Sequence, residues 1–168
     1  MNSKELRALQ QPLKKEYKTD PRKAELLLHA EGKLGAGITC EVETDAGVAE
    51  AGLHPATGGD GSQACSGDML LEALVACAGV TLKSVATAMD ISIREGSVKA
   101  EGLLDFRGTL GVSREAPVGF KSITLIFDLN SDADPKKIEK LIELTERYCV
   151  IYQTLKNSPS LNTETHLQ

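Results

Sequence analysis

Hydrophobic and polar residues alternate in several segments, and glycine-containing turns separate these segments from one another. Alternation, complete or partial, marks residues 24–32, 37–45, 47–55, 91–108 and 120–130. Such patterning is typical of half-buried strands, and the first three segments predict an antiparallel meander. In the last segment, apolar side chains occupy every second position from Ile123 to Leu129. The pattern therefore predicts two blocks of sheet on either side of a segment without alternation.

That intervening segment and a later one have helical character. Residues 68–89 contain no proline, one internal glycine and many good helix formers. A second helix is predicted over residues 134–156, with Asp134 as its N-cap and Pro135 at its first position. Apolar side chains recur along it at spacings of three and four: Leu141, Leu144, Tyr148, Cys149, Tyr152 and Leu155. This period places Cys149 in the buried stripe of one continuous helix.

Both ends of the chain carry weaker signals. Residues 3–18, rich in lysine and glutamate, predict a helical arm at the surface, in which Pro12 is a break or the start of a second helix. Residues 160–168 favour a closing strand. The chain is therefore divided into an N-terminal helical arm, residues 1–23, and one folded domain, residues 24–168.

The long helix over residues 68–89 is apolar around most of its circumference. Its apolar side chains do not fit one narrow stripe: Leu70, Leu71, Leu74, Val75, Cys77 and Val80. A helix of this kind must be covered on several sides, which one small sheet can hardly do. The order of strands and helices predicts an α+β fold, and the helix predicts a partner subunit, most simply in a symmetric homodimer.

Composition limits the classes of partner and the cellular location that can be expected. Hydrophobic residues make up 41% of the 168 residues, which suits one compact domain. A net charge of -5 without a basic cluster argues against nucleic acid and anionic membranes as partners. The N-terminus has no signal-peptide core, and the longest uncharged apolar run, residues 73–82, is too short to span a bilayer. The sequence predicts a cytoplasmic protein.

Two of the four cysteines are candidates for redox chemistry. None of Cys40, Cys65, Cys77 and Cys149 has the C-x-x-C spacing of a zinc site, so no metal is expected. Cys77 lies in the middle of the first long helix and Cys149 in the second. Two thiols on packed elements can form a reversible disulfide if their Cα atoms lie within about 4.4 to 6.8 Å, and such a pair can reduce a peroxide. The alternative is two independent core cysteines that act as small hydrophobes.

Two segments carry a resemblance to a known family. LLEALVACAGVTLKS (residues 70–84) and ERYCVIYQTLKN (residues 146–157) together resemble the family of osmotically inducible protein C and organic hydroperoxide resistance proteins, over roughly residues 30–165. The resemblance implies an OsmC-like fold, in which antiparallel sheets wrap around long buried central helices. It also implies an intertwined homodimer with active sites at the interface, and it identifies residues 24–168 as the OsmC-like domain.

The resemblance also implies roles for the two cysteines. By position, Cys77 resembles the thiol that attacks the peroxide and Cys149 the thiol that resolves the product. An external dithiol reductant then regenerates the protein, without a bound cofactor. In the family a proline often follows the resolving cysteine. Val150 stands there in this chain, which favours a helix that continues through Cys149.

The charged groups depart from the family pattern. The family's glutamate, ten residues before the first cysteine, is replaced by Gly67. The adjacent Asp68 is a substitute for it or a helix N-cap, and Glu72 is the other nearby acid. No arginine lies between residues 22 and 94, so Lys33 or Arg147 would have to lower the pKa of a thiol. The alternative for both cations is a solvated surface charge.

Three functions follow from these residues. The first is a thiol-dependent peroxidase that reduces organic hydroperoxides. The second keeps the fold without the reaction, as a dimeric protein that binds a small apolar ligand. The third is a thiol hydrolase in which His54 acts as a base for Cys65 or Cys77. The alternative to the third function is that His54 is a structural histidine before a turn proline and Cys65 an ordinary loop cysteine. Cys40 is expected in the sheet core.

Overall fold

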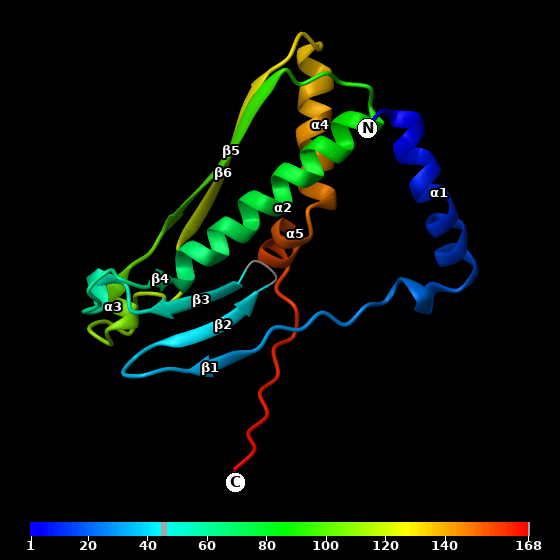
Figure 1. Cartoon of the computed structure of the whole chain (residues 1–168). Coiled ribbons are helices and arrows are strands. Elements are labelled where there is room, and N and C mark those ends of the chain that lie inside the picture. Colours follow the sequence, from blue (N-terminus) through cyan, green and yellow to red (C-terminus); the bar gives the residue numbers. More distant parts are fainter. Residues whose placement is uncertain (45–46, 168) are drawn as a thin grey trace.

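A long central helix and two sheets form the body of the chain, which a computed structural model describes over residues 1–44 and 47–167. Helix α2 (Ser66–Ala88) crosses the centre of the molecule (Figure 1). A two-stranded sheet contacts one side of α2, and α4 (Pro135–Tyr148) and α5 (Val150–Lys156) contact another. A four-stranded sheet leads into its N-terminal end. The arrangement confirms the predicted α+β fold.

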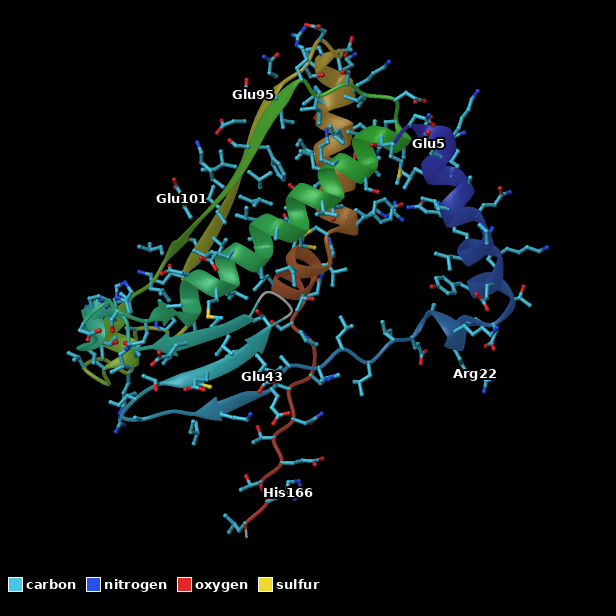
Figure 2. The ribbon with its side chains drawn as sticks, viewed as in Figure 1. Glu5, Arg22, Glu43, Glu95, Glu101 and His166 are labelled. Atoms are coloured by element: carbon cyan, nitrogen blue, oxygen red, sulfur yellow. The ribbon has the colours of Figure 1, made fainter. Side chains whose placement is uncertain are left out.

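The two-stranded sheet follows the predicted alternation. β5 (Glu95–Leu103) and β6 (Ser122–Asn130) pair antiparallel along their whole length. The alternate apolar side chains of β6 pack against the core around α2: Ile123, Leu125, Phe127 and Leu129. Figure 2 shows Glu95 and Glu101 of β5 pointing away from α2, on the opposite face. The sheet is therefore apolar toward the helix and charged toward the outside, as a half-buried antiparallel pair should be.

The four-stranded sheet contains the predicted meander with a shorter first strand. β1 (Gly32–Leu34), β2 (Cys40–Thr44) and β3 (Gly47–Gly52) pair antiparallel in that order, and β4 (Ala64–Cys65) adds a parallel edge to β3. The prediction of a strand over residues 24–32 was wrong. Among the described residues the ladder with β2 pairs Gly32 to Leu34, and the amide of Glu43 also donates to the carbonyl of Glu31. The leucine-rich residues before them therefore lie outside this ladder.

The core explains how α2 is held within one chain. Its fully buried side chains lie four residues apart along one stripe: Leu74, Ala78, Leu82 and Ala86. Val80, on another face, is 74% exposed. Among the described residues α2 is the one helix whose length and apolar composition would also suit a membrane span, which are properties that core helices share. One chain therefore covers only part of the circumference that the sequence predicts to be buried.

The remaining elements lie at the periphery. They are α1 (Ser3–Thr19), the short helix α3 (Phe106–Thr109) and the 3₁₀ turns η1 (Pro21–Ala24) and η2 (Pro55–Thr57). α1 confirms the helix predicted over residues 3–18, and Pro12 lies inside this unbroken helix and does not end it. Residues 160–167 contain no strand, contrary to the predicted closing strand, and Gln168 lies outside the described residues.

Candidate functional site

Cys77 and Cys149 meet in one apolar cluster although 72 residues separate them in the sequence. Cys77 lies in the middle of α2, and Cys149 lies at the junction of α4 and α5. Cys149 is 0% exposed and packs with Leu74 and Ala78 of α2, and Cys77 packs against the same cluster. Both are free thiols, and each shifts the pKa of the other. The fold therefore brings the two predicted redox residues together.

The second long helix is interrupted at Cys149, so the prediction of a continuous helix was wrong. α4 ends at Tyr148 and α5 begins at Val150, and Cys149 between them has φ -73° and ψ 111°, outside the helical region. Its sulfur accepts a hydrogen bond from the amide of Tyr152 at 3.5 Å, as an N-cap side chain does. Cys149 thus starts a new helix without a proline after it.

The start of α5 sets the electrostatics of Cys77. Burial opposes ionisation of its thiol, but nearby hydrogen-bond donors outweigh burial and lower the pKa of Cys77. These donors are the amides of Ile151 and Val150, the thiol of Cys149 and the hydroxyl of Thr81. Burial, together with the nearby Cys77, raises the pKa of Cys149. Of the two thiols, Cys77 is therefore the one whose surroundings favour ionisation.

The two candidate carboxylates do not reach the thiols within one chain. The N-cap of α2 is Cys65, so the prediction of Asp68 as N-cap was wrong; Asp68 lies exposed in the first turn. It precedes Cys77 by nine residues, which is about 13 Å along the helix axis. Glu72 is exposed as well, and neither acid is among the groups that shift the pKa of Cys77.

The candidate cations are also engaged elsewhere. Lys33 on β1 forms an ion pair with Glu43 on β2, with 3.0 Å between Nζ and Oε1. Arg147 lies over the ring of Tyr148, 5.4 Å from its centroid. In the described part of the chain, the groups that lower the pKa of Cys77 are two amides, a thiol and a hydroxyl. Neutral donors thus act on Cys77 where the family resemblance implied a cation, and Lys33 and Arg147 are both engaged away from the thiols.

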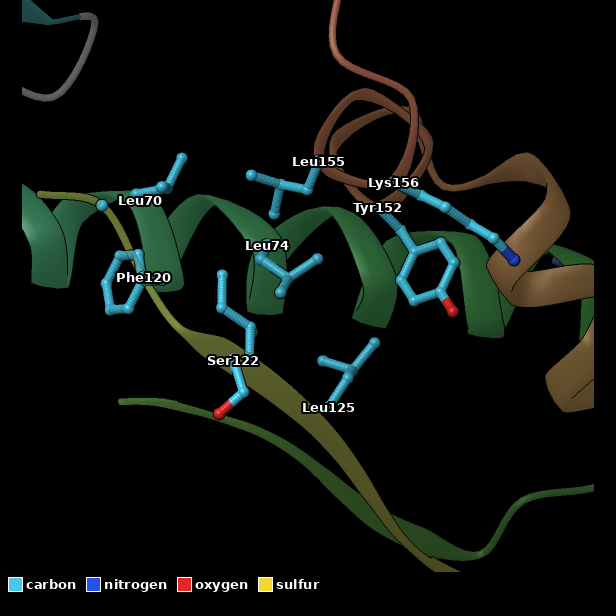
Figure 3. Close-up of a pocket in the computed structure, with 10 residues that line it drawn as sticks. Leu70, Leu74, Phe120, Ser122, Leu125, Tyr152, Leu155 and Lys156 are labelled. Carbon is cyan, nitrogen blue, oxygen red and sulfur yellow. The ribbon is translucent and has the colours of Figure 1, made fainter. Parts of the chain in front are cut away.

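An apolar pocket adjoins the thiol cluster (Figure 3). Its volume is about 510 Å³, within the range of small-molecule sites. It lies between α2, β6 and α5 and is lined by Leu70, Leu74, Gly119, Phe120, Ser122, Ile123, Leu125, Tyr152, Leu155 and Lys156. Leu74, Leu125 and Tyr152 belong both to this lining and to the cluster around Cys149. A small apolar molecule in the pocket would therefore contact the cluster that contains the thiols, although neither cysteine lines the pocket itself.

Sequence reasoning missed the role of Tyr152 in this site. Tyr152 lines the pocket, its amide donates to Cys149, and its hydroxyl donates to Oε2 of Glu146 at 3.1 Å. The periodic pattern identified Tyr152 only as a member of a buried stripe. Its position three residues after a candidate cysteine, the spacing between an N-cap and the amide it accepts from, was the available signal.

The other candidate residues, His54, Cys65 and Cys40, lie outside the thiol cluster. Nδ1 of His54 accepts a hydrogen bond from the amide of Ala56 at 3.0 Å, and its ring stacks on Phe106 with centroids 4.9 Å apart. Cys65 makes no side-chain cap bond, and Cys40 lies in β2 against Gly32. Within residues 1–44 and 47–167, no group of three or more histidine, cysteine or acidic side chains could hold a metal ion.

Comparison with known proteins places this geometry in a family. A search of curated proteins finds no match. The family model described as OsmC-like protein matches residues 59–164, which is more than half of the chain and includes both thiols.

Solved structures with the same fold align with most of the chain. The OsmC-like protein of Mycoplasma pneumoniae superposes with a TM-score of 0.67 at 17% identity, covering 80% of this chain and 90% of that one. An organic hydroperoxide resistance protein of Legionella pneumophila gives 0.61 at 20% identity, with 79% and 93% covered. The organic hydroperoxide resistance protein OhrB of Bacillus subtilis gives 0.58 at 19% identity, with 79% and 94% covered. This chain belongs to the family of OsmC-like proteins.

Proposed function

We propose that the protein is a thiol-dependent peroxidase that reduces organic hydroperoxides. The observation that carries the proposal is the contact between Cys77 and Cys149 in an apolar cluster, with the pKa of Cys77 lowered and that of Cys149 raised. The two thiols are thereby unequal, as a nucleophile and a resolving partner must be. Two of the structural relatives carry hydroperoxide resistance in their names, which agrees with this chemistry.

The reaction needs only these thiols, the hydroperoxide and a dithiol. The thiolate of Cys77 attacks the terminal oxygen of the hydroperoxide, the O–O bond breaks, and the alkoxide leaves as an alcohol with a proton. Cys77 is then a sulfenic acid, and the Cys149 sulfur displaces its oxygen as water while the S–S bond forms. Two electrons have passed from the thiols to the peroxide. An external dithiol returns them by thiol–disulfide exchange.

This mechanism is tested by the fate of the thiols. Addition of tert-butyl hydroperoxide to the reduced protein should consume two thiols per chain and release one equivalent of tert-butanol. Peptide mapping should then find Cys77 joined to Cys149, while Cys40 and Cys65 stay free. A disulfide that joins any other pair, or oxidation that stops at one thiol per chain, would contradict the mechanism.

The pocket should make the protein prefer apolar hydroperoxides, and Leu155 on α5 offers a test. Leu155 lines the pocket and is 37% exposed, so Leu155→Asp should fold and place a charge where an apolar group would bind. We expect kcat/KM for cumene hydroperoxide to fall about tenfold, while that for hydrogen peroxide changes less than about twofold. Both are measured in the same coupled assay with dithiothreitol.

The matched control for this substitution is Leu161→Asp. Leu161 is 90% exposed in the C-terminal segment and does not line the pocket. It should leave both kcat/KM values unchanged. Equal losses for the two substrates in Leu155→Asp would show that the pocket does not select the substrate.

A second candidate function is a binding protein for a small apolar ligand. It is favoured by one observation: Asp68 and Glu72 do not act on Cys77, and in the described residues no cation does so either. A pure binding protein would show no peroxide turnover, and an apolar ligand would raise its melting temperature. The third candidate, a thiol hydrolase, is disfavoured because Nδ1 of His54 already accepts a backbone hydrogen bond.

We further infer that the working molecule is a symmetric dimer in the cytoplasm. Val80 on α2 and Leu9 and Leu13 on α1 are exposed, so apolar surface of both helices remains for a second copy to cover. The domain spans residues 24–168, with residues 1–23 as an arm on this surface. Free thiols agree with a reducing compartment. The net charge of -5 gives no reason to expect nucleic acid or an anionic membrane as a partner.

A further inference from the structure

The interruption at Cys149 leaves a main-chain carbonyl without its helical partner. In a continuous helix the amide of Val150 would donate to the carbonyl of Glu146, four residues earlier. Within the described part of the chain no backbone amide donates to that carbonyl, because the extended conformation of Cys149 turns the Val150 amide away. Nothing in the residue type prevents the helical bond, since valine, unlike proline, keeps its N–H.

Two side chains of α5 take the place of that bond. Nε2 of Gln153 donates to the carbonyl oxygen of Glu146 at 2.8 Å, so the last turn of α4 is closed by a side-chain amide. The hydroxyl of Tyr152 donates to the carboxylate of the same residue at 3.1 Å. Both bonds are partly buried, where a hydrogen bond is stronger and an unsatisfied carbonyl is more unfavourable than at the surface.

The amides released from α4 are the ones that act on Cys77. The pKa of Cys77 is lowered by the amides of Ile151 and Val150, against the effect of burial. If Val150 returned its amide to Glu146, the same N–H could not point at the sulfur. The closed turn of α4 and the donors at Cys77 are thus two consequences of one backbone conformation.

We propose that Gln153, with Tyr152, is a positioning residue that holds the break between α4 and α5 by bonding Glu146, and so keeps the amides of Val150 and Ile151 on the thiol of Cys77. The inference rests on the proposed role of Cys77 as nucleophile. It concerns how the thiol is activated, and it can be tested without any peroxide. A failure of the peroxidase proposal and a failure of this one are therefore distinguishable.

The test is the pH dependence of Cys77 alkylation in the full-length reduced protein. Iodoacetamide labelling followed by peptide mass mapping gives the rate at Cys77 alone. Gln153→Leu keeps the size of the side chain but removes the donor, so the Val150 amide should return to Glu146. We expect the midpoint of the pH profile to rise by about one pH unit and the rate at pH 7 to fall about tenfold. Tyr152→Phe should move the midpoint in the same direction by less.

A rescue variant separates positioning from general damage. Proline at position 150 has no N–H to return to Glu146, disfavours a helical Cys149 and suits the first position of α5. Val150→Pro added to Gln153→Leu should therefore restore the break and the Ile151 donor, and bring back most of the lost rate. Thr154→Ala, the neighbouring exposed position, should leave the profile unchanged. A midpoint that Gln153→Leu does not move, or one that Val150→Pro does not lower again, overturns the proposal.

Discussion

Replacement of Cys77 by serine should abolish peroxide turnover, reducing kcat/KM for tert-butyl hydroperoxide by on the order of 10³-fold or more. A serine hydroxyl stays protonated where the Cys77 thiol ionises, so the amides at the start of α5 would face a group that cannot attack the O–O bond. The substitution is small and Cys77 is only half-buried, so the fold should persist. A coupled assay with an excess of dithiothreitol measures the loss.

The Cys149→Ser variant separates the attack on the peroxide from the resolution of the sulfenic acid. This variant retains the nucleophile, so it should consume one equivalent of hydroperoxide per chain and then stop or turn over slowly. The sulfenic acid should accumulate on Cys77 and be trapped there by dimedone, because the second thiol that condenses with it is gone. Cys40→Ser, in β2 and away from the thiol cluster, should retain full turnover. Multiple rapid turnovers by Cys77→Ser would end the assignment of the nucleophile.

The elements that local patterning specifies were predictable from the sequence. The alternation of β6 and the cap formed by Asp134 with Pro135 are both present, because each depends on residues close together in the chain. The leucines at residues 26–28 led to the wrong prediction of a strand over residues 24–32. Strand formation depends on a partner, and in this chain the ladder between β1 and β2 begins at Gly32.

The break at Cys149 was not predictable by the same reasoning. The apolar period from Leu141 to Leu155 runs through it without a change, and Val150 carries no signal of a helix end. The hydrogen bonds from Tyr152 and Gln153 hold it, and they reach back only six and seven residues to Glu146. The period of apolar residues does not record such side-chain bonds. Cys149 also packs against Leu74 and Ala78 of α2, a tertiary contact that local preference cannot show.

The candidate site was predictable in part for a related reason. The positions of Cys77 and Cys149 on two packing helices allowed their meeting to be expected, and the contact is present. The groups that lower the pKa of Cys77 were not expected. Sequence reasoning considered charged side chains, whereas in the structure the main-chain amides of Ile151 and Val150 lower it. Backbone donors are present at every residue except proline, so no residue pattern shows which of them will be free.

The second prediction with a large effect concerns dimer formation, and it follows from the exposed face of α2. Val80 is 74% exposed in one chain and lies three residues after Cys77, so a second copy that covers this face would also cover the thiol site. In a separate subunit Val80→Glu should change stability by less than about 0.5 kcal/mol, because the side chain remains in water. In a dimer the same carboxylate would be buried without a partner, at about 3 to 5 kcal/mol per copy.

The expected result is therefore a dimer for the unchanged protein and a folded monomer for Val80→Glu. A loss of about 3 kcal/mol raises the dimer dissociation constant on the order of 10²-fold, and two symmetric copies raise it further. Sedimentation equilibrium measures the constant, and Val112→Glu is the matched control, since Val112 is 72% exposed but lies outside α2. Peroxide turnover should fall with the dimer fraction in Val80→Glu and not in the control. A monomeric parent protein, or a Val80→Glu dimer of unchanged affinity, would mean that α2 keeps its apolar face in water, and the intertwined assembly would then be wrong for this chain.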